Sequence, residues 1–83
     1  MDDMTTEEFY RLIGENVAKY RKEKGLSQLD LSLSMGYKSV SVVSGAEIYY
    51  NKIHFNLEHI FKISQILDIE FCEFFKETPS SLS

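Results

Sequence analysis

Few residues of the chain have the types and spacing that metal binding or catalysis needs. His54 and His59 lie five positions apart, whereas two histidines that share a metal on one helix face are spaced i, i+4. Cys72 is the only cysteine and is distant from both, so the sequence predicts no zinc site. No glycine-rich phosphate loop, Ser/His/Asp set or paired carboxylates can be recognised. The sequence therefore predicts neither an enzyme nor a bound cofactor or metal.

The charge of the chain is unevenly distributed. The formal net charge is −4, but residues 9–64 hold eight basic and five acidic side chains, a local balance of +3. Residues 1–8 and 65–83 together carry −7. Because a phosphate backbone responds to the field within about 10 Å, the local balance matters more than the total. The charge pattern therefore permits a nucleic-acid partner without requiring one.

Length and composition indicate a single globular domain. The chain has 83 residues, of which 43% are hydrophobic and 13% aromatic, and this is too apolar for a disordered protein. A lone thiol, Cys72, is typical of a reducing compartment, so we expect a cytoplasmic protein. No apolar run approaches the roughly 18–20 residues of a membrane helix, and residues 1–4 do not resemble a signal peptide.

The elements that must position any site begin with a long amphipathic helix. Thr5 and Glu8 have the spacing of a capping box, and Gly25 predicts the end of the helix. Apolar residues recur between them at helical spacing, at Phe9, Ile13, Val17 and Tyr20. A short second helix is predicted from Ser27 to Gly36, with Leu31 and Met35 facing the core.

The stretch 38–47 is ambiguous between a strand and a helix. Its β-branched residues suit a strand, but a single short strand would have no partner in this chain. Val43 and Ala46 lie three apart, which suits a helix with Ser39 or Ser41 as the cap. We therefore predict a third helix here.

Two further helices are predicted after a loop over residues 48–55. Asn56 is a strong N-cap, Phe55 and Ile60 form a candidate hydrophobic staple, and Asp68 ends the helix. The apolar positions that mark this fourth helix are Leu57, Ile60, Phe61, Ser64 and Leu67. The aromatic residues over 71–75 suggest a short fifth helix in which Cys72 is a small buried hydrophobe. We expect an acidic arm over residues 1–8, an all-α five-helix domain over 9–75 and a frayed tail over 76–83.

Two short helices joined at a glycine and framed by longer ones form a helix-turn-helix plan, and here the sequence resembles a known family. Residues 13–28, which end in Gly-Leu-Ser-Gln, are similar to the opening of Cro/XRE-type repressors. Leu31-Ser32, Met35-Gly36 and the stretches 56–58 and 63–69 continue the likeness. The resemblance implies a compact lambda-repressor-like fold.

The resemblance also implies roles for individual residues. Gln28 opens the second helix and is expected to contact a DNA phosphate. Arg21 and Glu47 match an ion pair that ties the first and third helices together. This pairing requires one extra residue in the turn over residues 37–41, which places Val43 and Ala46 in the core and avoids a core role for Gly45.

The expected recognition helix departs from the family pattern. Similar proteins expose Gln, Arg, Asn, Ser or Thr there, whereas the residues expected to meet DNA here are Lys38, Ser39, Val40, Ser41 and Ser44. None of these offers the bidentate contacts that discriminate bases best, so base reading is weak or shared with DNA shape. Val40 could contact a thymine methyl group or pack in the core, and the sequence favours neither. Asn51 and Lys52, in the following loop, lie where similar proteins grip the backbone.

Related repressors often dimerise, and the aromatic residues near the C-terminus suggest where. Candidate dimer contacts are Ile66, Phe71, Phe74 and Phe75, and the alternative is that these residues close the core of the monomer. The resemblance therefore predicts a homodimer that binds double-stranded DNA as a transcriptional regulator, a repressor of bacterial or phage origin. The alternative is a protein-interaction module: an antitoxin that covers a toxin, or a domain of this fold that has lost DNA binding.

Overall fold

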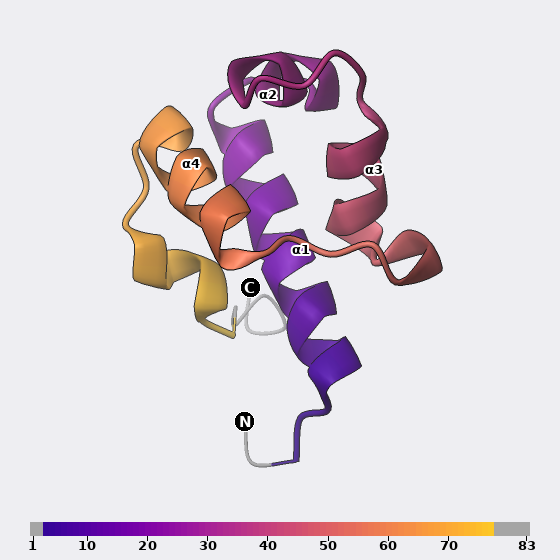
Figure 1. Ribbon diagram of the computed structural model, residues 1–83. Coiled ribbons are helices and arrows are strands. Elements are labelled where there is room, and N and C mark those ends of the chain that lie inside the picture. Colours follow the sequence, from indigo (N-terminus) through magenta and orange to yellow (C-terminus); the bar gives the residue numbers. More distant parts are fainter. Residues whose placement is uncertain (1–2, 78–83) are drawn as a thin grey trace.

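The computed structural model describes residues 3–77 (Figure 1). Within that range the chain forms four α-helices and two 3-10 helices and no strand. The α-helices are α1 Thr6–Glu23, α2 Gln28–Ser34, α3 Ser41–Ile48 and α4 Leu57–Leu67, and the 3-10 helices are η1 Tyr50–Lys52 and η2 Phe71–Phe75. The all-α class is confirmed, but the predicted fifth α-helix is a 3-10 helix. Of the residues expected to form the acidic arm, 6–8 already belong to α1.

Three helices start where the sequence predicts, because each has a reciprocal capping box. The Thr5 hydroxyl accepts from the Glu8 N–H at 3.1 Å, and the Thr5 N–H donates to the Glu8 carboxylate at 2.9 Å. Ser27 and Asp30 repeat this pattern at α2, and Asn56 and His59 repeat it at α4. Gly25 and Gly36 follow α1 and α2 with φ of +76° and +96°, a conformation that glycine adopts without strain.

The third helix exists, so the helical interpretation of residues 38–47 is confirmed over the strand. Its start differs from the prediction: Val40 occupies the N-cap position, and no side chain caps the first turn. Ser39 Oγ lies 3.0 Å from Ser41 Oγ and accepts from the Ser41 N–H at 3.5 Å. The backbone of Val40 is already helical, with φ −85° and ψ −9°, so the residue at the N-cap position lacks the extended geometry usual there.

The core lies where α1 crosses the other elements. Val17, Leu31 and Val43 from α1, α2 and α3 are completely buried, as are Ile63 and Phe74 from α4 and η2. Two α-helices approach each other closely at Gly14, because a Cβ built there would stand 2.5 Å from the Ala46 carbonyl oxygen and 2.6 Å from that of Glu47. Only glycine permits this approach, and it brings α3 onto α1.

The C-terminal segment over residues 71–75 is a 3-10 helix, and the side chain of Asn16 ties its end to α1. Asn16 is completely buried, and its Nδ2 donates to the carbonyl oxygens of Phe74 and Lys76, both at 2.8 Å. The segment is therefore anchored on α1 by a buried side chain. Cys72 is exposed, so its predicted burial is wrong. Lys76, expected in a frayed tail, is tied to the domain, and residues 78–83 of that tail lie outside the described residues.

The apolar residues of α4 form a wider stripe than the core can cover. Ile60, Ile63 and Leu67 are buried, whereas Leu57 is 70% exposed and Phe61 is 55% exposed. The periodicity that marked the helix was correct, but it did not identify which apolar residues face the core. No helix within residues 3–77 is long and apolar enough to cross a bilayer.

Candidate nucleic-acid interface

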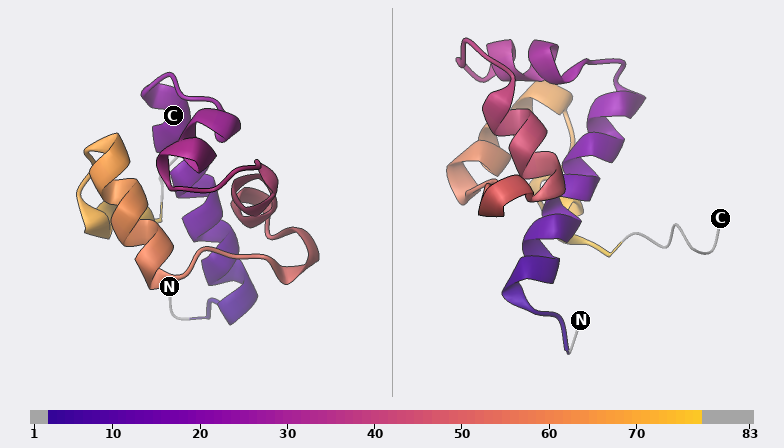
Figure 2. Two further views of the ribbon diagram at one scale, coloured as in Figure 1. Left: turned by 45° about the horizontal axis from the view of Figure 1, so that its top comes forward. Right: turned by 90° about the vertical axis from the view of Figure 1, so that its right-hand side faces the viewer.

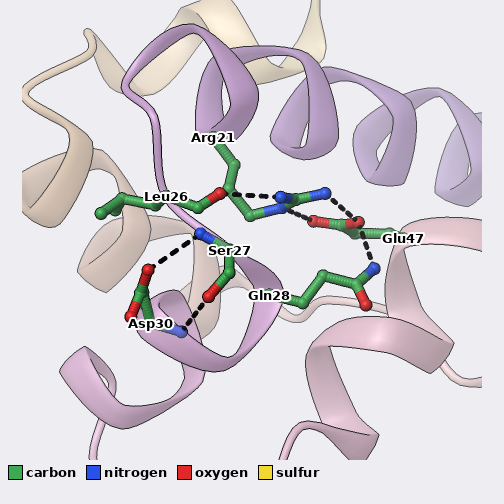
Figure 3. Close-up of polar contacts among 6 residues, drawn as sticks. All are labelled: Arg21, Leu26, Ser27, Gln28, Asp30 and Glu47. Carbon is green, nitrogen blue, oxygen red and sulfur yellow. Dashed lines mark hydrogen bonds and ion pairs between the residues drawn. The ribbon is translucent and has the colours of Figure 1, made fainter.

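A buried ion pair between α1 and α3 lies beneath the candidate interface and positions its residues (Figure 3). Arg21 Nε donates to Glu47 Oε2 at 2.7 Å, and Arg21 Nη2 donates to Glu47 Oε1 at 3.1 Å. Only 8% of the Arg21 side chain and 3% of the Glu47 side chain are exposed. Arg21 Nη1 also donates to the Leu26 carbonyl at 2.9 Å, which fixes the link between α1 and α2. The predicted partners Arg21 and Glu47 are thus paired; Val43 and Ala46 are buried as expected, but so is Gly45, for which no core role was expected.

Gln28 lies at the first position of α2 and is turned toward this ion pair. Its Nε2 donates to Glu47 Oε1 at 2.8 Å (Figure 3). An amide nitrogen carries two N–H groups, so one can stay on Glu47 while the other donates to a different acceptor. The residue expected to contact a phosphate is therefore held in a defined orientation by the helix-joining ion pair.

A surface depression adjoins Gln28 between α1 and α3, and it brings together basic residues that the sequence analysis did not select. Lys19 and Lys22 on α1 line it together with Gln28 and Ile48, and the acids Glu15 and Glu47 line it as well. Both lysines are exposed. The signal that could have found them is their spacing of three on one helix, close before Gln28.

The expected base-reading residues lie in the turn before α3 and along its start. Lys38, Ser39 and Ser41 are exposed, and Val40 and Ser44 are partly buried. The hydroxyl groups of Ser39 and Ser41 bond to each other at 3.0 Å, and Ser44 Oγ donates to the Ser41 carbonyl at 3.3 Å. A serine that contacted a base would have to break one of these local hydrogen bonds. The Lys38 side chain forms no such bond and would not have to.

The loop after α3 is held in an uncommon backbone conformation. Asn51 and Lys52 are exposed, and their φ angles are +55° and +66°; Tyr49 has +59°. Such angles are unfavourable for residues other than glycine and persist where surrounding contacts impose them. The ring of His54 stacks on that of Tyr10 at 3.9 Å, and His54 Nδ1 lies 2.9 Å from the Lys52 carbonyl oxygen.

Two residues of α1 anchor this loop, and the sequence analysis missed both. Tyr10 stacks on His54 and, at 5.9 Å, on Tyr49. Arg11 donates to the Ile48 carbonyl at 3.2 Å and lies over the Tyr49 ring. Sequence periodicity could not find them, because they face a loop far along the chain.

The comparison with known proteins agrees with this architecture. The helix-turn-helix family matches residues 17–74, which is more than half of the 83-residue chain. The chain belongs to this helix-turn-helix family. The expected Cro/XRE-type relationship is thereby confirmed. No curated protein matches the chain.

In this helix-turn-helix domain, α2 and α3 are the two helices of the motif, and Figure 2 shows α2 across the C-terminal end of α1 and α3 running alongside α1. The turn that joins them is tied to α4, because the Tyr37 hydroxyl lies 2.7 Å from His59 Nε2. His59 Nδ1 accepts from the Asn56 N–H at 3.1 Å in the capping box of α4. Burial lowers the pKa of His59, against a smaller upward effect of Glu58.

The candidate dimer residues do not share one environment in this helix-turn-helix domain. Phe74 is completely buried within the chain, so it closes the core of the monomer and is not a dimer contact. Ile66 and Phe75 are partly buried against the core, and Phe71 is 40% exposed.

Within residues 3–77, no group of His, Cys, Asp and Glu side chains is arranged to hold a metal ion.

Proposed function

We propose that the protein is a transcriptional regulator that binds double-stranded DNA and represses by occupying its site. The observation that carries the proposal is Gln28, held by Glu47 at the start of α2 with one amide N–H left to donate. A phosphate that accepted this bond would lie beside Lys19 and Lys22, in the depression that all three residues line. Membership in the helix-turn-helix family supports the same function.

Base contacts in this proposal come from the turn before α3. Lys38 is exposed and can donate to a guanine edge or to a phosphate. Because the nearby serines bond to one another, we propose that sequence discrimination rests largely on DNA shape and on Lys38. Asn51 and Lys52 contact the backbone from the loop after α3, where the stacking of His54 on Tyr10 holds the loop against α1.

The test is binding to mixed-sequence duplex DNA at low and moderate salt. The variant combines Gln28→Ala, Lys38→Ala and Lys52→Ala, and the control combines Gln65→Ala, Lys62→Ala and Lys76→Ala. Both remove two positive charges and one exposed or partly exposed amide. We expect the first variant to lose affinity and to reduce the salt slope by about 2, because each lysine that contacts a phosphate contributes about one unit.

The control should bind like the wild-type protein. Equal losses in both triple variants would mean that only total charge matters, which contradicts the proposed contacts. A folded wild-type protein that does not bind at low salt would instead support the protein-interaction module, with a toxin or other protein as the partner. Circular dichroism of each variant shows whether the domain is folded.

A further inference from the structure

The ring of His59 joins the first turn of α4 to the turn between α2 and α3. On one side of the ring, His59 Nδ1 accepts a hydrogen bond from the Asn56 N–H at 3.1 Å. On the other side, His59 Nε2 lies 2.7 Å from the Tyr37 hydroxyl oxygen. Tyr37 directly precedes Lys38, to which the proposed function gives a contact with DNA. One imidazole therefore links a helix cap to the turn that carries a candidate DNA contact.

The two hydrogen bonds of His59 determine which ring nitrogen carries the proton. Because a backbone N–H can only donate, Nδ1 must be the nitrogen without a proton. The single proton of the neutral ring then lies on Nε2, which donates to the Tyr37 oxygen. This geometry thus requires a neutral ring in one tautomer.

Packing around His59 favours the neutral ring. The rings of Tyr37 and Phe55 lie edge-on to it, with centroids 6.1 Å and 6.0 Å away. The charged and titratable groups that act on the ring from α4 and from the preceding loop are Glu58, Lys62 and His54. Burial is the largest effect and lowers the pKa of His59; Glu58 raises it, and Lys62 and His54 lower it further.

A second proton on His59 is incompatible with this geometry. In the charged ring both nitrogens carry N–H groups, so Nδ1 would turn a donor toward the Asn56 N–H. The ring must then leave its position, and its bond to Tyr37 is lost with it. Of the two hydrogen bonds recorded for Tyr37, only that from its N–H to the Ser32 carbonyl, at 3.0 Å, remains.

We propose that His59 positions the turn between α2 and α3 through Tyr37, and that a proton on His59 releases this turn and weakens DNA binding. His59 is a positioning residue in this mechanism, because it acts on Lys38 only through Tyr37. The effect on DNA rests on the proposed function, whereas the release of the turn can be measured without DNA. A positive charge added to the protein by itself favours DNA binding, so a loss of affinity in acid identifies the release of the turn.

The first test is amide hydrogen exchange by NMR between about pH 7.5 and 5.5, without DNA. The protein carries His54→Gln, which leaves His59 as the only histidine of the chain. We expect protection of the Tyr37 N–H to fall at the pH at which the His59 ring resonances titrate. In His54→Gln/His59→Gln this protection should not change with pH.

The Leu26 N–H is the matched internal control for this exchange. It donates to the Arg21 carbonyl at 3.1 Å after Gly25, as the Tyr37 N–H donates to Ser32 after Gly36. Its protection should stay constant, because α1 ends far from His59 along the chain. If both amides lose protection equally, acid acts on the whole domain and the proposal is wrong. Constant protection of the Tyr37 N–H would also overturn it, whether or not the protein binds DNA.

The second test measures affinity for mixed-sequence duplex DNA at about pH 7.5 and 5.5 and constant salt. In His54→Gln we expect affinity to fall at least about threefold at the lower pH, since couplings between two sites commonly change affinity about fivefold or more when complete. In His54→Gln/His59→Gln the affinity should not fall. An affinity of His54→Gln that is unchanged or higher in acid would contradict the proposal.

Tyr37→Phe tests whether Tyr37 transmits the effect, because it keeps the packing of the ring and removes the hydroxyl. In the His54→Gln background, acid should still destabilise this variant in urea, but its affinity for DNA should no longer fall. Tyr20→Phe is the matched control, since it removes a hydroxyl that bonds to Glu73 on η2 at 3.1 Å. It should keep the full pH dependence of affinity. If Tyr37→Phe keeps that dependence as well, the effect does not pass through Tyr37.

Discussion

At the residue scale, the contact between α1 and α3 depends on a glycine. A Cβ at Gly14 would overlap the carbonyl oxygens of Ala46 and Glu47, which are backbone atoms and cannot rotate away. We expect Gly14→Ala to lower the free energy of unfolding by about 1–3 kcal/mol, as overpacking does in other cores. Urea unfolding measures this change.

Gly45→Ala provides the matched control, because both substitutions place alanine inside a helix. A Cβ there would meet Ile53 Cδ1 at 2.9 Å, the movable end of a side chain. Gly45→Ala should therefore cost less than Gly14→Ala. An equal cost at both positions would mean that the close approach of the backbones at Gly14 is not the cause.

The buried Arg21–Glu47 pair gives a second prediction at this scale. Glu47→Ala leaves the Arg21 guanidinium buried with only the Leu26 carbonyl as a partner. We expect a loss of about 3–5 kcal/mol in the free energy of unfolding, which is typical when one member of a buried pair is removed. The double variant Arg21→Met/Glu47→Leu should recover much of the loss, because apolar residues can replace such a pair. A double variant as unstable as Glu47→Ala would contradict this explanation.

At the element scale, the capping box that stabilises the first turn of α4 depends on pH. His59 Nδ1 accepts from the Asn56 N–H only when the ring is neutral, and burial lowers the pKa of His59 below its usual 6.5. The unfolded chain therefore takes up the proton first as the pH falls. The contribution of His59 is complete above about pH 6.5 and decreases as the pH falls from there toward the lower folded-state pKa.

The measurement compares the wild-type protein with His59→Gln in urea between about pH 7.5 and 5.5. Glutamine at this position of a capping box can still accept the Asn56 N–H but does not titrate. We expect the difference in stability to shift in favour of the variant as the pH falls. A difference that stays constant with pH would contradict a titrating role for His59.

At the scale of the whole molecule, we expect the position of the charges to matter more for DNA binding than the net charge. The chain carries a net charge of −4, yet the depression beside Gln28 contains Lys19 and Lys22. If a phosphate lies there, Lys19→Ala/Lys22→Ala should reduce the salt slope of DNA binding by about 1–2. Lys62→Ala/Lys76→Ala changes the net charge equally on the other side of the molecule.

A salt slope that falls equally in both double variants would show that the charges act only through the total. A slope that falls only in Lys19→Ala/Lys22→Ala would place the phosphate backbone beside α1.

Local signals in the sequence determined most of the elements. Capping boxes, helical periodicity and the two turn glycines act over a few residues, so Thr5, Ser27 and Asn56 could be identified as helix starts without any fold. Family spacing also implied the partners Arg21 and Glu47, and the structure brings them together. These features predict the order of the helices and the position of the motif.

Only the tertiary structure decided what each polar or apolar side chain meets. Asn16 reaches the carbonyls of Phe74 and Lys76, 58 and 60 positions away, and anchors the last segment on α1. Gln28 is oriented by Glu47, and Leu57 and Phe61 remain exposed although their spacing matched a buried stripe. Periodicity reports that a helix has an apolar side. Which part of that side is covered depends on the crossing of α1 with α3, α4 and η2, and this crossing is set by contacts between distant residues.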